Sequence, residues 1–136
     1  MKRLLSQEVL VMLNKACPRY TSLNVAVTTS AASSQIDVDT QWLVETGGED
    51  YGDYKIARFD LYVAGYDALD SSNREYFEAF AKFPRWIKEE GWKICRLGDF
   101  DIYSMTCSPP RFVRQLNDSR QLRAVTITIK YNERSD

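Results

Sequence analysis

A chain of 136 residues can bury one hydrophobic core but is short for two domains. Hydrophobic residues make up 44% of it, and no apolar run reaches the roughly 18 to 20 residues of a membrane span, which predicts a soluble protein. The start MKRLLSQEV has too short an apolar stretch for a secretory signal, which predicts a cytosolic location. The formal net charge of -1 argues against a generally basic nucleic-acid binder. Three widely spaced cysteines, Cys17, Cys95 and Cys107, argue against a disulfide framework.

The first predicted element is a helix from about Ser6 to Cys17, where apolar residues recur at helical spacing. Ser6 is the expected N-cap, and Pro18 ends the helix because a residue before proline is pushed out of the α region. Alternation with period two then predicts strands over about residues 23–28, 36–44 and 54–66. The segment ETGGEDYGDY between the last two has three glycines and predicts a long exposed hairpin loop.

A second helix is expected where Ser72 and Glu75 have the spacing of a capping box. Its apolar stripe consists of Tyr76, Phe77, Phe80, Phe83 and Ile87. Pro84 lacks the N–H of an interior helical residue, so the helix is expected to break or bend near Lys82 to Pro84, unless a new helical segment begins there. Gly91 is the expected C-terminal stop.

The last part of the chain predicts more strands. WKICRL and DFDIYSM are separated by a Gly-Asp turn, CSPPRFVRQLNDS is irregular, and the terminal strand places Val125, Ile127, Ile129 and Tyr131 on one face. We expect Ile127 and Ile129 in the core. The order of elements predicts one α+β domain over residues 1–136, with an antiparallel or mixed β-sheet of about five to six strands, two main helices packed on one face, and a long β-hairpin loop.

The residues offer little for catalysis. The chain has no histidine, which removes the commonest general base and metal ligand near neutral pH. Carboxylate pairs two residues apart, Asp99 with Asp101 and Asp37 with Asp39, are most simply interpreted as solvated strand faces. Cys107 requires an activating partner that the sequence does not show. No catalytic, cofactor-binding or metal-binding residue is predicted.

Charge placement is more informative than any catalytic pattern. The segment from Glu45 to Asp53 carries four acidic residues and no basic one, whereas RFVRQLNDSRQLR carries four arginines against Asp118 alone. Two exposed loops that merely differ in charge would explain this. Complementary contacts between neighbouring copies of the chain would explain it too. On the second interpretation the partner-binding residues are Glu45, Glu49, Asp50, Tyr51, Asp53, Arg111, Arg114, Arg120 and Arg123.

Three stretches can be compared with a known family. FDLYVAGYDALDS leads into the aromatic helix NREYFEAFAKFPRWI; a glycine and short strands follow; and SRQLRAVTITIKYNE is an arginine-rich approach to an alternating strand that contains a tyrosine near its end. Together they resemble the phage neck and tail terminator proteins. The resemblance covers roughly Tyr54 to Glu133 and consists of patterns of residue class.

The resemblance implies a structural virion protein and no enzyme. The implied subunit forms a ring, typically of six copies, at the head-proximal end of a phage tail, where it caps the tail tube, ends its polymerisation and joins it to the head-completion or connector proteins. The implied partners are other copies of the chain, the tail tube protein, the connector proteins and DNA passing through the lumen without sequence specificity, with no membrane and no cofactor. The implied location is the virion, after assembly in the host cytoplasm.

Other functions remain open at the level of sequence. A head-side completion ring of the same neck is also built from small subunits. A small enzyme using a carboxylate pair such as Asp99 and Asp101, or a monomeric module whose aromatic loops hold a ligand, belongs to a different class. The mass of the protein in solution separates these alternatives, because only the ring functions require an oligomer.

Overall fold

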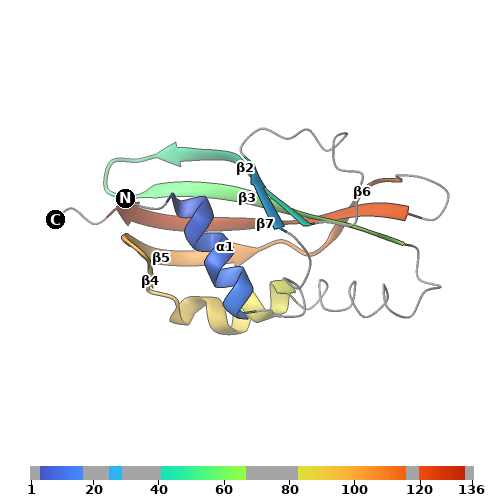
Figure 1. The fold of residues 1–136 in the computed structure, drawn as a ribbon. Coiled ribbons are helices and arrows are strands. Elements are labelled where there is room, and N and C mark those ends of the chain that lie inside the picture. The colour runs from blue at the N-terminus through green and yellow to red at the C-terminus, as the bar shows by residue number, and fades with distance from the viewer. Residues whose placement is uncertain (1–3, 17–24, 29–40, 67–82, 116–119, 134–136) are drawn as a thin grey trace.

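The computed structural model describes residues 4–16, 25–28, 41–66, 83–115 and 120–133 (Figure 1). Residues 83–90 are helical, and the other elements are α1 (Leu5–Ala16), β1 (Val25–Thr28), β2 (Gln41–Asp50), β3 (Lys55–Tyr66), the 3-10 turn η2 (Gly91–Lys93), β4 (Arg96–Leu97), β5 (Phe100–Cys107), β6 (Arg111–Gln115) and β7 (Arg120–Glu133). Several predicted features lie outside the described residues: the start of the first strand, Ile36 to Asp39, the capping box of Ser72 and Glu75, and the stripe residues Tyr76, Phe77 and Phe80.

The described strands form one sheet in the order β1-β2-β3-β7-β5-β4, and β6 pairs with β7 off this path. Strands β2 to β7 pair antiparallel, whereas β1 lies parallel to β2. Helix α1 crosses in front of the sheet, and the second helix runs beside β4 and β5 (Figure 1). The predicted α+β class is therefore confirmed.

Strand β7 is the centre of the sheet. It pairs with β3 over twelve positions, from Tyr131 opposite Lys55 to Arg120 opposite Tyr66. On its other side, β5 pairs with the second half of β7 and β6 with the first half. Ile127 and Ile129 are completely buried on one face, so the predicted core position of both residues is confirmed.

The two helices bury their apolar stripes against that face. Val9 and Leu13 of α1 are four residues apart and buried, and so are Phe83 and Ile87 of the second helix. All four belong to one core together with Leu43, Ala57, Phe59, Leu61, Phe100, Ile102, Met105, Val125, Ile127 and Ile129. Each fully buried side chain of this size stabilises the fold by roughly 1.5–3 kcal/mol.

The helix ends differ from expectation in detail. The N–H of Leu4 donates to Oε1 of Gln7 at 2.8 Å, so Leu4 is the N-cap of α1, and Ser6, the expected cap, is buried in the first turn. The stop expected at Gly91 is confirmed, since the helix of residues 83–90 gives way there to η2. Gly91 does not have a positive φ. A Cβ there would lie 3.3 Å from Cγ2 of Ile87, so the close packing of the helix end favours glycine.

The hairpin between β2 and β3 is long in strand and short in loop. Residues 45–50, expected in the loop, belong to β2 and pair with residues 55–59 of β3, with an irregularity in register at Thr46. The chain reverses within residues 51–54, where the N–H of Tyr51 donates to the carbonyl of Tyr54 at 2.9 Å. The extent of the predicted loop is thus corrected from ten residues to a tight turn.

The β2–β3 and β4–β5 hairpins both turn at a Gly-Asp pair. Gly52 and Gly98 have φ of 85° and 58°, and each is followed by an aspartate at negative φ. A positive φ at the first loop residue is the requirement of a type II′ hairpin and favours glycine. The Gly-Asp turn predicted at Gly98 is confirmed. The strand WKICRL is shorter than predicted, because Trp92 lies in η2 and β4 has only two residues.

The segment after β5 was expected to be irregular, but it contains β6. Pro109 and Pro110 have no N–H to donate. They therefore interrupt the ladder along β7 at the point where β5 ends and β6 has not yet begun. Ser108, just before them, binds β7 twice: its N–H donates to the carbonyl of Thr126 at 2.9 Å, and its Oγ accepts from the N–H of Thr126 at 2.8 Å. Strands β5 and β6 therefore continue one another along the same edge of β7.

Candidate interaction surfaces

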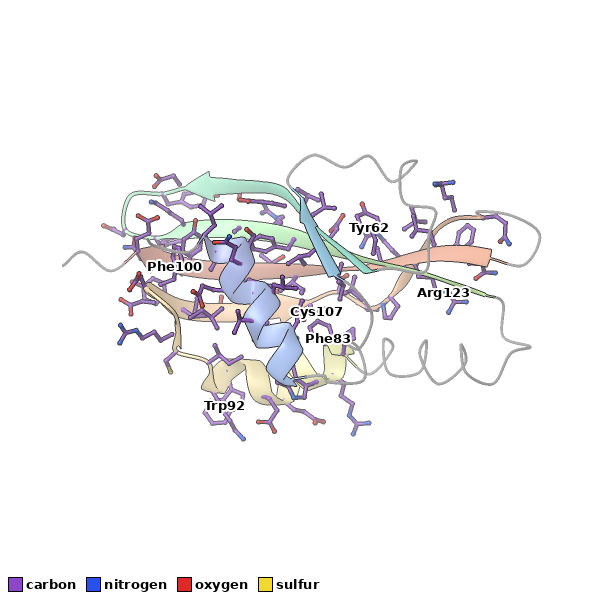
Figure 2. The ribbon with its side chains drawn as sticks, in the orientation of Figure 1. Tyr62, Phe83, Trp92, Phe100, Cys107 and Arg123 are labelled. Atoms are coloured by element: carbon purple, nitrogen blue, oxygen red, sulfur yellow. The ribbon has the colours of Figure 1, made fainter. Side chains whose placement is uncertain are left out.

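The predicted acidic and basic residues lie at opposite ends of the sheet. The turn between β2 and β3 lies where β7 ends, whereas β6 lies where β7 begins (Figure 1). At about 3.3 Å per residue, the ladder of β3 and β7 is roughly 36 Å long, and the acidic part of β2 and β6 are centred roughly 20 Å apart along it. Figure 2 shows the same separation, with Phe100 toward the acidic end and Arg123 toward the basic end.

The basic end consists of β6 and the first residues of β7, which brings the four predicted arginines into one region. The register places Arg111 opposite Ala124, Arg114 opposite Leu122, and Arg123 opposite Phe112. Because opposite residues of an antiparallel pair share a face, Arg111 and Arg114 lie on the face away from the helices, and Arg123 lies with Phe112 on the other. Arg120 begins β7, and its side chain is outside the described set. Phe112 is 58% exposed.

Arg111 is part of a network around the carboxylate of Asp60, which is 8% exposed. Its Nη2 donates to Oδ2 of Asp60 at 3.0 Å, and its Nη1 donates to Oγ1 of Thr126 at 2.9 Å. Asp60 also accepts hydrogen bonds from Oγ1 of Thr126 at 2.7 Å and from the hydroxyl of Tyr62 at 3.2 Å. Burial and the neighbouring carboxylate of Asp60 raise the pKa of Tyr62. This network joins β3, β6 and β7.

The acidic end also divides between the two faces. Glu45 lies opposite Phe59 on the helix side, whereas Glu49 lies opposite Ile56 on the other face. There Glu49 forms a bidentate contact with Arg58, with Nη1 to Oε1 and Oε2 distances of 2.8 and 2.6 Å. This partner raises the pKa of Arg58 further. Burial raises the pKa of Tyr131, and the charges of Glu133, Glu45 and Asp50 add to that effect.

The tip of the β2–β3 hairpin is held by several contacts. Oδ1 of Asp50 accepts the N–H of Gly52 at 2.9 Å, and the carbonyl of Asp53 accepts from Nδ2 of Asn132 at 2.9 Å. The rings of Tyr51 and Tyr54 stack with centroids 5.0 Å apart, and Nζ of Lys130 lies 4.0 Å from the Tyr54 centroid. The tip therefore has its own hydrogen bonds within the subunit.

The structure does not assemble the catalytic candidates into a site. Asp99 is exposed in the turn after β4, and Asp101 lies opposite Arg96 and Asn132 within the ladder. Burial raises the pKa of the Cys107 thiol from 9.0 to about 12, which opposes formation of a thiolate. Among the described residues, no group of three or more Cys, Asp and Glu side chains is placed to hold a metal ion. No helix in the described ranges is long and apolar enough to cross a membrane.

Sequence reasoning missed residues that join the charged ends to the sheet. Arg58 pairs with Glu49, and Asp60 pairs with Arg111, although Asp60 and Arg111 are 51 residues apart in the chain. Only one signal in the sequence pointed to the true hairpin turn, the Gly-Asp pair at Gly52. The same pair correctly located the turn at Gly98.

Comparison with known proteins adds no assignment: neither a protein-family model nor a curated protein matches the chain.

Proposed function

We propose that the chain is the subunit of a ring at the head-proximal end of a phage tail, where it caps the tail tube and joins it to the connector. The resemblance of residues 54–133 to tail terminator proteins suggests this function. The observation that supports it best is the segregation of opposite charges at opposite ends of one sheet. A ring with one kind of subunit needs two different surfaces that fit each other, and opposite charges at two separate places supply such a pair.

The ring is proposed to consist of six copies, with the tail tube on one side and the connector on the other. DNA would pass through the lumen without being read. A head-side ring of the same neck uses the same kind of contact between copies, so the two functions differ in which neighbouring protein binds. The distribution of charge within the subunit supports both.

Two measurements test this function. Light scattering should give an oligomer several times the 15.7 kDa chain, either alone or after addition of the tail tube protein. In polymerisation of the tube protein, substoichiometric amounts of this chain should shorten the tubes. If the oligomer binds the isolated connector and leaves the length of the tubes unchanged, the chain forms the head-side ring instead. A chain that stays monomeric with either protein would contradict both ring functions.

A charge-reversal variant, Arg114→Glu with Arg120→Glu, should prevent ring formation, because acidic surfaces would then face each other in every contact. Reversal of Glu49 and Asp50 to Lys in the same chain should partly restore the ring. If the reversal left the ring intact but weakened DNA retention, the arginines would face the lumen instead.

A further inference from the structure

The outer edge of β2, on the side away from β3, is a candidate binding surface in addition to the charged ends. Among the described strands, β1 pairs only with Gln41–Val44, and none pairs with β2 on that side over residues 45–50. Since Tyr51 is hydrogen-bonded to Tyr54, the alternation of an antiparallel ladder turns the backbone groups of Asp50 and Gly48 away from β3. This part of β2 thus presents backbone donors and acceptors at the edge of the sheet.

An unpaired edge strand can form hydrogen bonds with a strand of another chain, and the charged side chains on the edge determine which strands bind there. Glu45, Glu49 and Asp50 disfavour pairing of this edge with the same edge of another copy, because carboxylates would face carboxylates. The same charges favour a basic strand. The described basic strand of this chain is β6, which carries Arg111 and Arg114, has five residues, and pairs with β7 along one side.

We propose that β2 of one copy, over residues 45–50, accepts β6 of the next copy as an added antiparallel strand, so that the sheet continues from subunit to subunit. This inference rests on the proposed ring function and specifies the contact that builds it. Strand addition supplies backbone hydrogen bonds for affinity and side chains for specificity.

The strand directions of the sheet fit this contact. β2 runs antiparallel to β3, β3 to β7, and β7 to β6, so β6 runs opposite to β2 within one subunit. A neighbour in the same orientation therefore presents β6 antiparallel to β2. The two segments also match in length, with six positions on β2 and five on β6.

The charges fit on both faces of the continued sheet. A neighbour in the same orientation also keeps its faces, so Glu49, which is paired with Arg58 in its own subunit, meets Arg114 and the Arg111–Asp60 pair on the face away from the helices. On the helix side, Glu45 and Asp50 meet the face that carries Phe112 and Arg123. The exposed ring of Phe112 supplies apolar area at the centre of this contact.

The contact also requires a stagger. β6 lies beside residues 121–124 of β7, whereas the acidic part of β2 is level with residues 127–131. Neighbours are thus displaced along the strands by roughly 20 Å as each sheet extends the last. A stagger of this kind accompanies tilted strands when a sheet closes on itself.

The test uses two variants that each retain one good surface. The acidic-side variant is Glu45→Lys with Glu49→Lys, and the basic-side variant is Arg114→Glu with Arg123→Glu. Each alone should require at least about tenfold more protein to assemble, because every contact joins like charges. An equimolar mixture should assemble again, since two reversed surfaces fit each other and so do two native ones. Lys88→Glu, a reversal at an exposed site on the second helix, should assemble as the parent does.

Circular dichroism first establishes that each variant is folded. A mixture of folded variants that stays dissociated would overturn the proposal. Hydrogen exchange of the parent chain provides an independent test without any substitution: on assembly, amides of residues 45–50 and 111–115 should gain protection. A ring that forms without this protection would overturn strand addition and leave the ring function intact. A parent chain that forms no oligomer, with or without the tube protein, would overturn both.

Discussion

Two thiols of the described structure differ in what surrounds them. Cys95 precedes β4 and is exposed. Cys107 ends β5 and packs against the core, and its burial raises the pKa of the thiol from 9.0 to about 12. A sulfur that keeps its proton at neutral pH is a weak nucleophile. The position of Cys107 therefore fits packing and gives no support to an enzyme based on this thiol.

This contrast predicts selective alkylation. In a Cys17→Ser background at pH 8, iodoacetamide should modify Cys95 at least about tenfold faster than Cys107, because the thiolate is the reacting form. Mass spectrometry of the peptides measures both rates. Equal rates would show that Cys107 is accessible and readily ionised in the folded chain.

The same pKa predicts a dependence of stability on pH. The folded state holds the Cys107 proton above pH 9, where the unfolded state releases it, so the contribution of this group to the free energy of unfolding falls as pH rises from about 9 toward 12. Urea unfolding should show a steeper loss over this range for the parent than for Cys107→Ala, in which this group is absent. Parallel losses in the two proteins would contradict the assignment.

At the scale of elements, the predictable strands are those that bury one face. Over residues 125–129, β7 alternates apolar and polar residues because the helices cover one of its faces, and this alternation revealed its core positions. Residues 45–50 of β2 are exposed on both faces, so they need no apolar residue and the alternation is absent. Their pairing with β3 comes from backbone hydrogen bonds, which composition does not reveal.

The missed strand β6 and the split of the charged ends have the same origin. β6 follows two prolines, pairs with β7, and is held by contacts that are distant in sequence, such as those of Arg111 with Thr126 of β7 and Asp60 of β3. Sequence predicted which residues carry charge, but the face of each residue depends on register. An irregularity at Thr46 in β2 and another between Phe112 and Arg114 in β6 set those registers.

The hairpin predicts unequal effects of alanine at two adjacent glycines. A Cβ at Gly48 would lie 2.5 Å from the backbone oxygen of Ile56, whereas a Cβ at Gly47 would meet nothing within 4 Å. Gly48→Ala should therefore lower the free energy of unfolding by about 1–3 kcal/mol, as overpacking does. Gly47→Ala should stay within about 0.5 kcal/mol of the parent. Urea unfolding compares the three proteins, and equal effects would mean that the edge of β2 adapts freely.

At the scale of the whole molecule, one core holds both helices on the sheet. Ile127 and Ile129 are completely buried in it, and Thr128 between them faces the opposite side. Truncation of either isoleucine to alanine should cost about 2–5 kcal/mol, the range for a large-to-small change with its cavity. Thr128→Ala should cost less than about 1 kcal/mol. Thermal or urea unfolding measures both, and a loss below about 0.5 kcal/mol at both isoleucines would exclude these core positions.

The central place of β7 also has a consequence for protein synthesis. This strand follows every other described strand along the chain, yet β3, β5 and β6 all hydrogen-bond to it. A ribosome adds about 5–20 residues per second. Until it has passed residue 133, β3, β5 and β6 cannot complete their pairing with β7. A nascent chain cut short before β7 lacks the strand on which its sheet depends. Premature termination should therefore yield a substrate for proteases and not a half-built subunit that competes for places in an assembly.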